Sequence, residues 1–407
     1  MGLTRVLIVD DSAFMRHALG RLLNEAPTLE VVGAACNGVE GLRMAGELHP
    51  DVITLDVEMP VLDGLGMLKR LMVETPTRVV MLSSRTTYNA KVTLDALEFG
   101  AIDFVPKPSG SLSIDIGRVG EELVGKIEAA AGMTEAAFLR HRQVAAMNLM
   151  LAGAHTPEAA HERHAATDTL AARLKATAAT GHATREPRSG SRVAAQRLVV
   201  IAASTGGPMA LHSVIKGLPA HLGAAVVIVQ HMPPGFTASL ASRLDSAGEL
   251  RCSEATSEDV LIEDETLVAP GDRHMLSSRT GHIQLAHLPT VNGVRPAADV
   301  TLQSVAPIWK EHLLCVVLTG MGWDAREGAR AVKQHGGTVI AQDAATSTIY
   351  GMPAAVAEAG LADRILPLGK VAAAIAAWCR GEELEWWGDE PAAHHDQRFS
   401  DGQRLAS

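Results

Sequence analysis

Acidic side chains follow the first and third apolar segments of the chain. Asp10 and Asp11 come directly after RVLIV, and Asp56 comes directly after DVITL. If these segments are parallel strands, their carboxyl ends meet at one edge of a sheet and bring the carboxylates together. Carboxylates held this close raise one another's pKa unless a cation lies between them. The residues therefore predict a site for a hard divalent cation with oxygen ligands, most simply Mg²⁺.

A hydroxyl and an ammonium group complete this first set. Ser83 ends the fourth apolar segment, RVVML, and Lys107 follows the fifth, AIDFV. Carboxylate, metal, hydroxyl and ammonium together suit an aspartate that accepts a phosphoryl group, whose new charge is then neutralised. Taken singly, each residue has an ordinary explanation, because an Asp at a strand end often caps a helix and a lone Lys is usually solvated. The prediction depends on the five occurring in this order.

A second set of reactive residues lies in the second half of the chain. Ser204 follows LVVIAA, His231 follows AVVIVQ, and Asp324 comes shortly after LLCVVLT. A serine is a nucleophile only when an imidazole accepts its proton, and the imidazole needs an acceptor that fixes its tautomer. The turn STGGP also leaves backbone N–H groups free at a helix start, where they would stabilise an oxyanion. These features predict a nucleophile, a base and an orienting carboxylate at one sheet edge.

The residues alone leave alternatives open for each member of this set. STGGP could bind phosphate, although it is neither G-x-G-x-x-G nor a Walker A sequence. His231 could be structural, with His274, His282 and His287 as competitors, and Asp324 could cap the following helix. The order Ser…His…Asp differs from that of α/β-hydrolases, and there is no G-x-S-x-G turn.

The spacing of apolar segments predicts the elements that position both sets. Residues 5–127 alternate five short apolar runs with helical patterns, such as 13–26, which Ser12 would cap. Four more apolar runs after Arg197 predict a second parallel sheet, with a turn-rich antiparallel insertion over 254–286. The fold class is therefore α/β, with two doubly wound parallel-sheet domains. The expected division is 1–127, a helical or flexible linker over 128–196, a domain over 197–381, and a disordered tail over 382–407.

Composition excludes several classes of protein. Of 407 residues, 47 % are hydrophobic and 20 % charged, which indicates a globular chain. A net charge of −10 and only 3 % aromatic residues argue against nucleic-acid binding, which needs cations and stacking platforms. No apolar run is long enough to cross a membrane, and no signal peptide begins the chain. Four widely spaced cysteines show no zinc spacing. We expect a cytoplasmic protein without direct membrane insertion.

Residues 4–125 resemble a response-regulator receiver domain. The motifs that carry the resemblance are LIVDDS, TLDVEMPVLDG, VVMLSS and DFVPKP. It implies a flavodoxin-like fold in which Asp56 accepts a phosphoryl group from a histidine kinase and Mg²⁺ is held by Asp10, Asp11 and Asp56. The residues that it implies to respond to phosphorylation are the switch hydroxyl Ser83, the aromatic Phe104, and Lys107, which contacts the phosphoryl group.

Residues 197–380 resemble the catalytic domain of chemotaxis protein-glutamate methylesterases. The matching segments include IAASTGGP, QHMPPGFTASLASRLD, APGDRHML, RPAADVTLQSVA, LTGMGWDAREGA and AQDAATSTIYGMPAAVAEAG. The resemblance implies a Rossmann-like domain with Ser204 as nucleophile, His231 as general base and acid, and Asp324 as orienting carboxylate. Backbone N–H groups near Met321 are candidates for the oxyanion hole, and the ester chemistry needs no cofactor. One departure is Ala325, which follows Asp324 where the family usually has Gly.

The two resemblances together imply a phosphorylation-regulated esterase. Its expected substrates are glutamate γ-methyl esters on the cytoplasmic helices of methyl-accepting chemoreceptors, which it would convert to glutamate and methanol. Deamidation of receptor glutamines is implied as well, and a chemotaxis histidine kinase is the implied phosphodonor. The linker would let the first domain dock over the Ser204 edge and block the substrate. The alternative is a receiver-controlled scaffold or interaction protein without enzymatic output.

Overall fold

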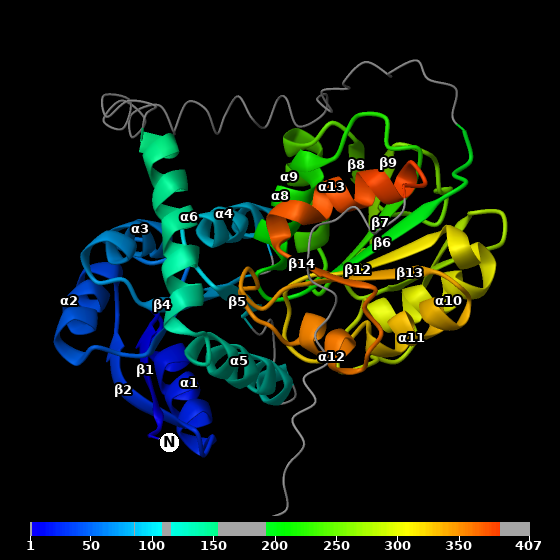
Figure 1. Ribbon diagram of the computed structural model, residues 1–407. Coiled ribbons are helices and arrows are strands. Elements are labelled where there is room, and N and C mark those ends of the chain that lie inside the picture. Colours follow the sequence, from blue (N-terminus) through cyan, green and yellow to red (C-terminus); the bar gives the residue numbers. More distant parts are fainter. Residues whose placement is uncertain (1, 85, 108–114, 154–192, 383–407) are drawn as a thin grey trace, which may run out of the picture.

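The computed structural model describes residues 2–84, 86–107, 115–153 and 193–382. Two parallel α/β sheets, each covered by helices on both faces, form two domains that lie side by side (Figure 1). Most of the predicted linker and nearly all of the predicted tail lie outside the described residues. Among the described helices, none combines the length and apolarity that a membrane span requires.

The first domain contains a five-stranded parallel sheet with the order β2-β1-β3-β4-β5. Its strands are β1 (Thr4–Val9), β2 (Leu29–Ala35), β3 (Val52–Asp56), β4 (Arg78–Ser83) and β5 (Asp103–Pro106). Successive side chains of a strand point to opposite faces. In β1, Val6 and Ile8 therefore belong to one core, whereas Leu7 and Val9 belong to the other.

Six helices accompany this sheet. They are α1 (Ala13–Glu25), α2 (Gly38–Leu48), α3 (Gly64–Glu74), α4 (Thr87–Glu98), α5 (Asp115–Ala131) and α6 (Glu135–Gly153). Helices α1 and α5 cover one face, and α2, α3 and α4 cover the other. The predicted cap of α1 is confirmed, because the Ser12 side chain accepts a hydrogen bond from the Met15 N–H. Helix α6 packs against α3 and α4, and its Phe138 ring lies 4.7 Å from the guanidinium of Arg78.

The second domain is built on a seven-stranded parallel sheet with the order β14-β13-β12-β6-β7-β9-β8. Its strands are β6 (Leu198–Ala203), β7 (Ala225–Gln230), β8 (Arg251–Glu254), β9 (Glu265–Val268), β12 (Leu313–Val317), β13 (Thr338–Gln342) and β14 (Arg364–Leu366). A separate antiparallel pair is formed by β10 (His274–Ser277) and β11 (Ile283–Ala286).

Helices cover both faces of this second sheet. On one face lie α8 (Gly207–Gly217), α9 (Phe236–Ala247) and α13 (Leu368–Cys379). On the other lie α10 (Ala298–Trp309), α11 (Arg326–Gln334) and α12 (Met352–Glu358), with the single turn η1 (Lys310–His312) after α10. The predicted fold class, two parallel α/β domains with a small antiparallel pair, is confirmed.

The extent of the predicted antiparallel insertion over 254–286 is wrong. Strand β9 lies within that range but joins the main sheet in parallel, between β7 and β8. The antiparallel strand pair extends over His274–Ala286, and isolated antiparallel bridges add Val260 to His282 and Ile262 to Ala194. Strands β8, β9 and β14 have three or four residues each, which is too short for periodicity to identify them.

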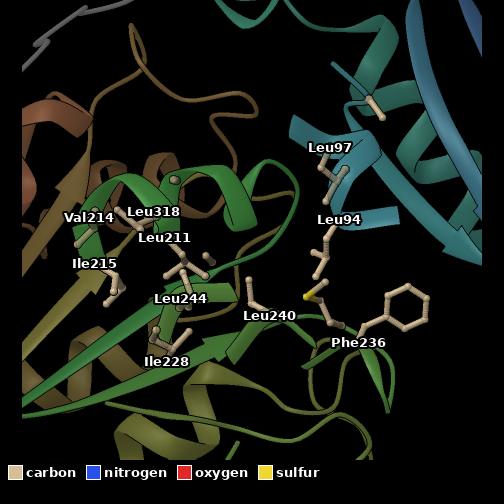
Figure 2. Packing of buried hydrophobic residues seen from close by; sticks show 14 of the residues in the cluster. Leu94, Leu97, Leu211, Val214, Ile215, Ile228, Phe236, Leu240, Leu244 and Leu318 are labelled. Atoms are coloured by element: carbon tan, nitrogen blue, oxygen red, sulfur yellow. The ribbon is translucent and has the colours of Figure 1, made fainter. Parts of the chain in front are cut away.

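A continuous apolar cluster joins the two domains. Helix α4 packs against α8 and α9, so Leu94 and Leu97 lie in the same buried cluster as Phe236 and Leu240 of the second domain (Figure 2). Removing this surface from water stabilises the contact between the domains. The first domain is therefore held at a defined place on the second.

Candidate functional site

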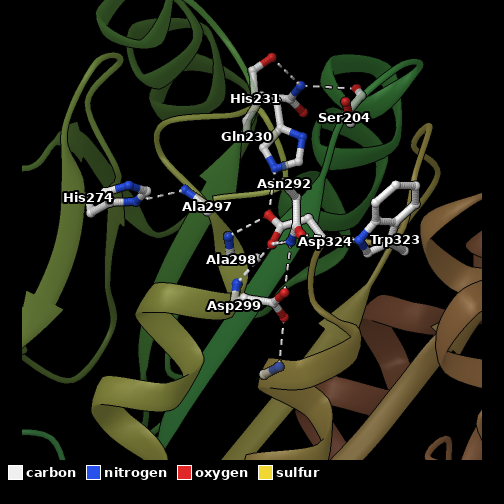
Figure 3. Close-up of polar contacts among 11 residues, drawn as sticks. Ser204, Gln230, His231, His274, Asn292, Ala297, Ala298, Asp299, Trp323 and Asp324 are labelled. Carbon is white, nitrogen blue, oxygen red and sulfur yellow. Dashed lines mark hydrogen bonds and ion pairs between the residues drawn. The ribbon is translucent and has the colours of Figure 1, made fainter. Parts of the chain in front are cut away.

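Three adjacent strands bring the second set of predicted residues to one edge of the seven-stranded sheet. Strand β6 lies between β12 and β7, and all three run in parallel. Ser204 follows β6, His231 follows β7, and the turn after β12 carries Asp324. The three side chains come from neighbouring carboxyl ends, where ligands bind in sheets of this kind (Figure 3).

The turn that carries Ser204 is fixed by its neighbours. The Ser204 N–H donates to the Thr319 carbonyl oxygen (3.0 Å), and the Ser204 carbonyl accepts from Gln230 Nε2 (3.0 Å). Gly206 has a φ of 76°, and a Cβ on Gly207 would lie 2.0 Å from Gln230 Oε1, so the turn requires glycine. Within the described part of the chain, no hydrogen bond engages Ser204 Oγ. The hydroxyl is thus free to react.

His231 and Asp324 form a hydrogen-bonded pair. Nε2 of His231 lies 2.7 Å from Oδ2 of Asp324, and the side chains are 10 % and 2 % exposed. The first backbone N–H groups of α10, those of Ala298 and Asp299, donate to the Asp324 carboxylate at 2.6 Å and 3.0 Å. Burial opposes ionisation, but the His231 ring and these donors together hold the pKa of Asp324 below its ordinary value. Nδ1 of His231 remains free of the carboxylate.

The competing histidines are placed differently. His274 is buried, and both its ring nitrogens are engaged by backbone: Nδ1 accepts from Ala297 (3.2 Å), and Nε2 donates to the Pro289 carbonyl (3.0 Å). This pattern fixes a neutral tautomer and a structural role. His282 and His287 are exposed residues beside the antiparallel pair. The geometry therefore favours the histidine after β7 as the base.

Free backbone N–H groups lie on the two turns beside Ser204. Those of Thr205 and Gly206 precede α8, and that of Met321 belongs to the turn after β12; in the described ranges none of the three has a hydrogen-bond acceptor. The positive end of the α8 macrodipole points to the same place. These groups are able to bind a developing oxyanion.

The first set of predicted residues forms a carboxylate cluster at the edge of the five-stranded sheet. Asp10, Asp11 and Asp56 each place one carboxylate oxygen within 4.8 Å of the others. Lys107 Nζ lies 2.8 Å from Asp10 Oδ2 and 2.7 Å from Asp56 Oδ2. Burial, partly offset by Lys107, raises the pKa of Asp56 to about 6. One ammonium group leaves excess negative charge on oxygen ligands, which is typical of a Mg²⁺ site.

The two predicted switch side chains contact other elements. The Ser83 hydroxyl lies 2.7 Å from that of Thr93 on α4. The Phe104 ring stacks on Phe236 of the second domain, with centroids 4.5 Å apart and planes inclined by 20°. The sheet edge that carries the carboxylate cluster therefore reaches the second domain through β5 and α4.

A hydrogen bond links the first domain to the residue after Ser204. The buried Thr205 hydroxyl donates to the Asp103 carboxylate on β5. The same carboxylate pairs with Lys126 Nζ on α5, 3.3 Å away. Asp103 directly precedes Phe104, so one strand of the first domain contacts the second domain through both residues.

Ion pairs and close packing extend this contact. Arg243 on α9 lies 2.6 Å from Asp95 and 2.9 Å from Glu98, both on α4. A Cβ on Gly125 of α5 would lie 3.3 Å from Cε of Met321. The α4–β5–α5 side of the first domain therefore lies against the turns that follow β6 and β12.

Sequence reasoning does not single out several residues of the second site. Thr205 and Gln230 flank predicted residues, so adjacency in sequence could have indicated them. Asn292 and Asp299 lie about one helix and one strand before Asp324, and no motif spacing connects them with it. Only the fold brings them together, as Figure 3 shows.

Fold and site together define a response regulator whose second domain is a parallel α/β domain with a serine, a histidine and an aspartate at one sheet edge. Two families match the chain: "Response regulator receiver domain" over residues 6–114 and "CheB methylesterase" over residues 199–375. The chain belongs to the protein-glutamate methylesterase/protein-glutamine glutaminase family.

Relatives of this description align over almost the whole chain. One from Symbiobacterium thermophilum is 47 % identical over 371 residues, which are 91 % of this chain and 96 % of the relative. One from Pyrococcus abyssi is 41 % identical over 370 residues, which are 90 % and 91 % of the two chains. The CheB methylesterase catalytic domain of Thermotoga maritima is a similar solved structure (45 % identity, TM-score 0.44, covering 45 % of this chain and 98 % of that one).

Proposed function

We propose that this chain hydrolyses glutamate γ-methyl esters on the cytoplasmic helices of chemoreceptors and deamidates glutamines there. The relatives are described as protein-glutamate methylesterases and protein-glutamine glutaminases, which supports the reaction type. The observation that carries the residue assignment is the 2.7 Å pair between His231 and Asp324 beside the Ser204 turn. Ser204 is the nucleophile, His231 the general base and acid, and Asp324 the orienting carboxylate.

Acylation follows from this geometry. Because Nε2 of His231 is bonded to Asp324, Nδ1 is the nitrogen that accepts the Ser204 proton. Ser204 Oγ bonds to the ester carbonyl carbon, and the resulting oxyanion is stabilised by the free N–H groups of Thr205, Gly206 and Met321. The imidazolium then protonates the methoxy oxygen, the C–O bond breaks, and methanol leaves.

Deacylation repeats the same transfers with water. His231 removes a proton from water, the hydroxide bonds to the acyl carbon, and the Ser204 ester bond breaks as Oγ regains a proton. The products are a glutamate side chain and the free enzyme. With a glutamine substrate the first leaving group is ammonia, and the second half of the reaction is unchanged.

The carboxylate cluster supplies the input. Asp10, Asp11 and Asp56 would hold Mg²⁺, and the bound cation would supply charge shielding for phosphoryl transfer. Asp56 accepts the phosphoryl group from a histidine kinase, and Lys107 pairs with the new charge. Ser83 and Phe104 respond to it. Ser83 contacts α4, and Phe104 stacks on Phe236 of the second domain. These contacts support a path from Asp56 to the second domain.

The docked first domain inhibits the esterase. Its α4–β5–α5 side lies against the turns that carry Ser204 and Met321, the place where a receptor helix would have to bind. Phosphorylation of Asp56 shifts the equilibrium toward an undocked form. In this proposal residues 1–127 are the receiver domain and 197–381 the catalytic domain, with the linker over 128–196 between them.

A Ser204→Ala variant tests the proposal. We expect methanol release from methylated receptor membranes to fall by at least about a thousandfold, because the acyl intermediate cannot form. Phosphorylation of Asp56 by a small-molecule donor should be unchanged, which shows that the variant is folded. Labelling of wild-type Ser204 by a serine-directed probe is a second readout. Hydrolysis retained in the variant would refute Ser204 as the nucleophile, whereas a wild type without hydrolysis and without labelling would favour the scaffold.

A further inference from the structure

Two buried carboxylates lie side by side beneath the His231 ring. Asp324 and Asp299 are 2 % and 4 % exposed, and the backbone N–H of Asp299 donates to Asp324 Oδ1 at 3.0 Å. Neighbouring carboxylates that both ionise repel each other strongly away from water. Burial and the charge of Asp324 raise the pKa of Asp299. Something must stabilise the pair if Asp324 is to stay ionised opposite His231.

The side-chain amide of Asn292 bridges the two carboxylates. Its Nδ2 lies 2.9 Å from Asp299 Oδ2 and 3.2 Å from Asp324 Oδ1. An amide nitrogen carries two protons, one for each acceptor. The other donors to this pair are the backbone N–H groups of Ala298, Asp299 and Gly328 and the His231 ring, so Asn292 is the side chain that serves both acids.

The orientation of this amide is fixed by Trp323. Indole Nε1 is a donor only, and it lies 3.1 Å from Asn292 Oδ1. The oxygen therefore faces the indole, and the nitrogen must face the acids. Figure 3 shows the amide between Trp323 and the acids. The backbone is suited to this place, because Asn292 and Gly293 both have positive φ (54° and 77°), as Asn-Gly turns require.

The other titratable groups around the two carboxylates cannot take the place of the Asn292 amide as a donor to both. Facing it are His231 from the end of β7, Cys315 from β12, and Glu327 from α11. Burial raises the pKa of the Cys315 thiol, so it stays neutral. Glu327 adds a further negative charge near Asp299. Of these groups only His231 favours an ionised Asp324, and His231 is the group that Asp324 has to orient.

We propose that Asn292 is a positioning residue of the esterase, whose amide holds Asp324 ionised and aimed at His231. This inference rests on the proposed function of Ser204, His231 and Asp324. Without the amide, Asp324 loses a donor and is left beside Asp299, and proton sharing between the acids then competes with the His231 hydrogen bond. The imidazole consequently loses the acceptor that fixes its tautomer.

The variants Asn292→Ala and Asn292→Asp test this role in the full-length, phosphorylated protein. Both should lower kcat for methanol release by about 10- to 100-fold with KM nearly unchanged, because a misplaced general base affects the chemical step. The aspartate variant should be the slower of the two, since it adds a third carboxylate. Both should also lose the downfield imidazole N–H proton resonance of the His231–Asp324 hydrogen bond, assigned by its absence in His231→Ala.

A reciprocal exchange separates positioning from mere support of the fold. Adding Asp299→Asn to Asn292→Asp restores one amide and one carboxylate beside Asp324, so kcat should recover at least about tenfold over Asn292→Asp alone. Trp323→Phe keeps a ring but removes the donor, and should lower kcat less than Asn292→Ala. The matched control is Asn24→Asp, which adds the same charge where Oδ1 only accepts from the Val31 N–H in the first domain.

Several results would overturn the proposal. These are a kcat within about twofold of wild type in both Asn292 variants, retention of the downfield resonance, or a rise in KM with unchanged kcat, which would make Asn292 a substrate contact. Ester hydrolysis that persists in Ser204→Ala would instead refute the proposed function. Serine labelling in the Asn292 variants distinguishes the two failures, because Ser204 remains in place.

Discussion

The pKa values of two buried aspartates, Asp56 and Asp324, shift in opposite directions because their surroundings differ. Asp324 accepts from the His231 ring and from the first N–H groups of α10, and its pKa is lowered despite burial. Asp56 has Lys107 but also lies beside Asp10, and burial raises its pKa to about 6. The same type of side chain is thus kept ionised in one domain and favours the protonated form in the other unless a cation is bound.

The raised pKa of Asp56 predicts how pH and Mg²⁺ act on the receiver domain. The folded state holds this proton more tightly than the unfolded state, so the stability that Asp56 contributes is complete below about pH 4 and is lost as pH rises through about 6. Mg²⁺ should restore it, because the cation neutralises the carboxylates. Thermal melts should therefore show a larger Mg²⁺-induced rise in Tm at pH 8 than at pH 5.

An Asp56→Asn variant is the control for this prediction. Its melting temperature without Mg²⁺ should fall less between pH 5 and pH 7 than that of the wild type, and its Mg²⁺ response should be weaker. Equal pH profiles in the two proteins would contradict the assigned environment of Asp56.

The turns that follow β6, β7 and β12 determine the geometry of the esterase site. They pack closely enough that side chains are excluded at particular positions. A Cβ on Gly320 would lie 2.8 Å from Cβ of Ser204 and 2.4 Å from Sδ of Met352. The turn that carries Asp324 is thus in direct contact with the turn that carries Ser204.

Gly320→Ala should therefore impair both stability and catalysis. The added methyl group displaces the Ser204 turn, and we expect about 1–3 kcal/mol less stability and a loss of at least about tenfold in kcat. Denaturant unfolding and initial rates of methanol release measure the two effects. Gly369→Ala is the control, because nothing lies within 4 Å of the added atom there. Wild-type kinetics in Gly320→Ala would contradict the packing of these turns.

The sequence predicts the site residues that follow long strands. It does not predict those that short turns and short strands bring to the site. Apolar runs such as LVVIAA and AVVIVQ identify the strands that place Ser204 and His231, because buried parallel strands are continuously hydrophobic. The bridge by Asn292 is different, since it depends on a two-residue turn that meets α10 and the β12 turn only in the folded chain. The predicted antiparallel insertion is too long for the same reason, because β9 has four residues and its sheet partners are set by tertiary contacts.

At the scale of the whole molecule, the contact between the domains combines apolar burial with charge. Leu94 and Leu97 bury apolar surface against the second domain, and Arg243 pairs with Asp95 and Glu98 at the edge of that surface. Partly exposed ion pairs contribute little to affinity alone but penalise a reversed charge strongly. The ion pairs are therefore a place to weaken docking without disturbing either core.

Arg243→Glu should raise basal esterase activity of the unphosphorylated protein about three- to tenfold, because a glutamate opposite two carboxylates weakens docking. Methanol release without phosphodonor measures this. Adding Asp95→Lys should return the rate toward that of the wild type. Lys333→Glu, which breaks an ion pair between α11 and Asp363, the residue before β14, is the matched control and should leave the basal rate unchanged. A basal rate insensitive to Arg243→Glu would count against inhibition by the docked receiver.

The packing of α4 on α8 and α9 also means that each second domain has one first domain docked on it. The docked first domain and the second domain are parts of one polypeptide, so under the proposed inhibition each molecule has one inhibitor at a local concentration that dilution does not change. The unphosphorylated activity per molecule should therefore be the same at nanomolar and micromolar protein. If the proposed inhibition holds, a cell that makes more of this chain gains capacity without raising the fraction that is active before stimulation.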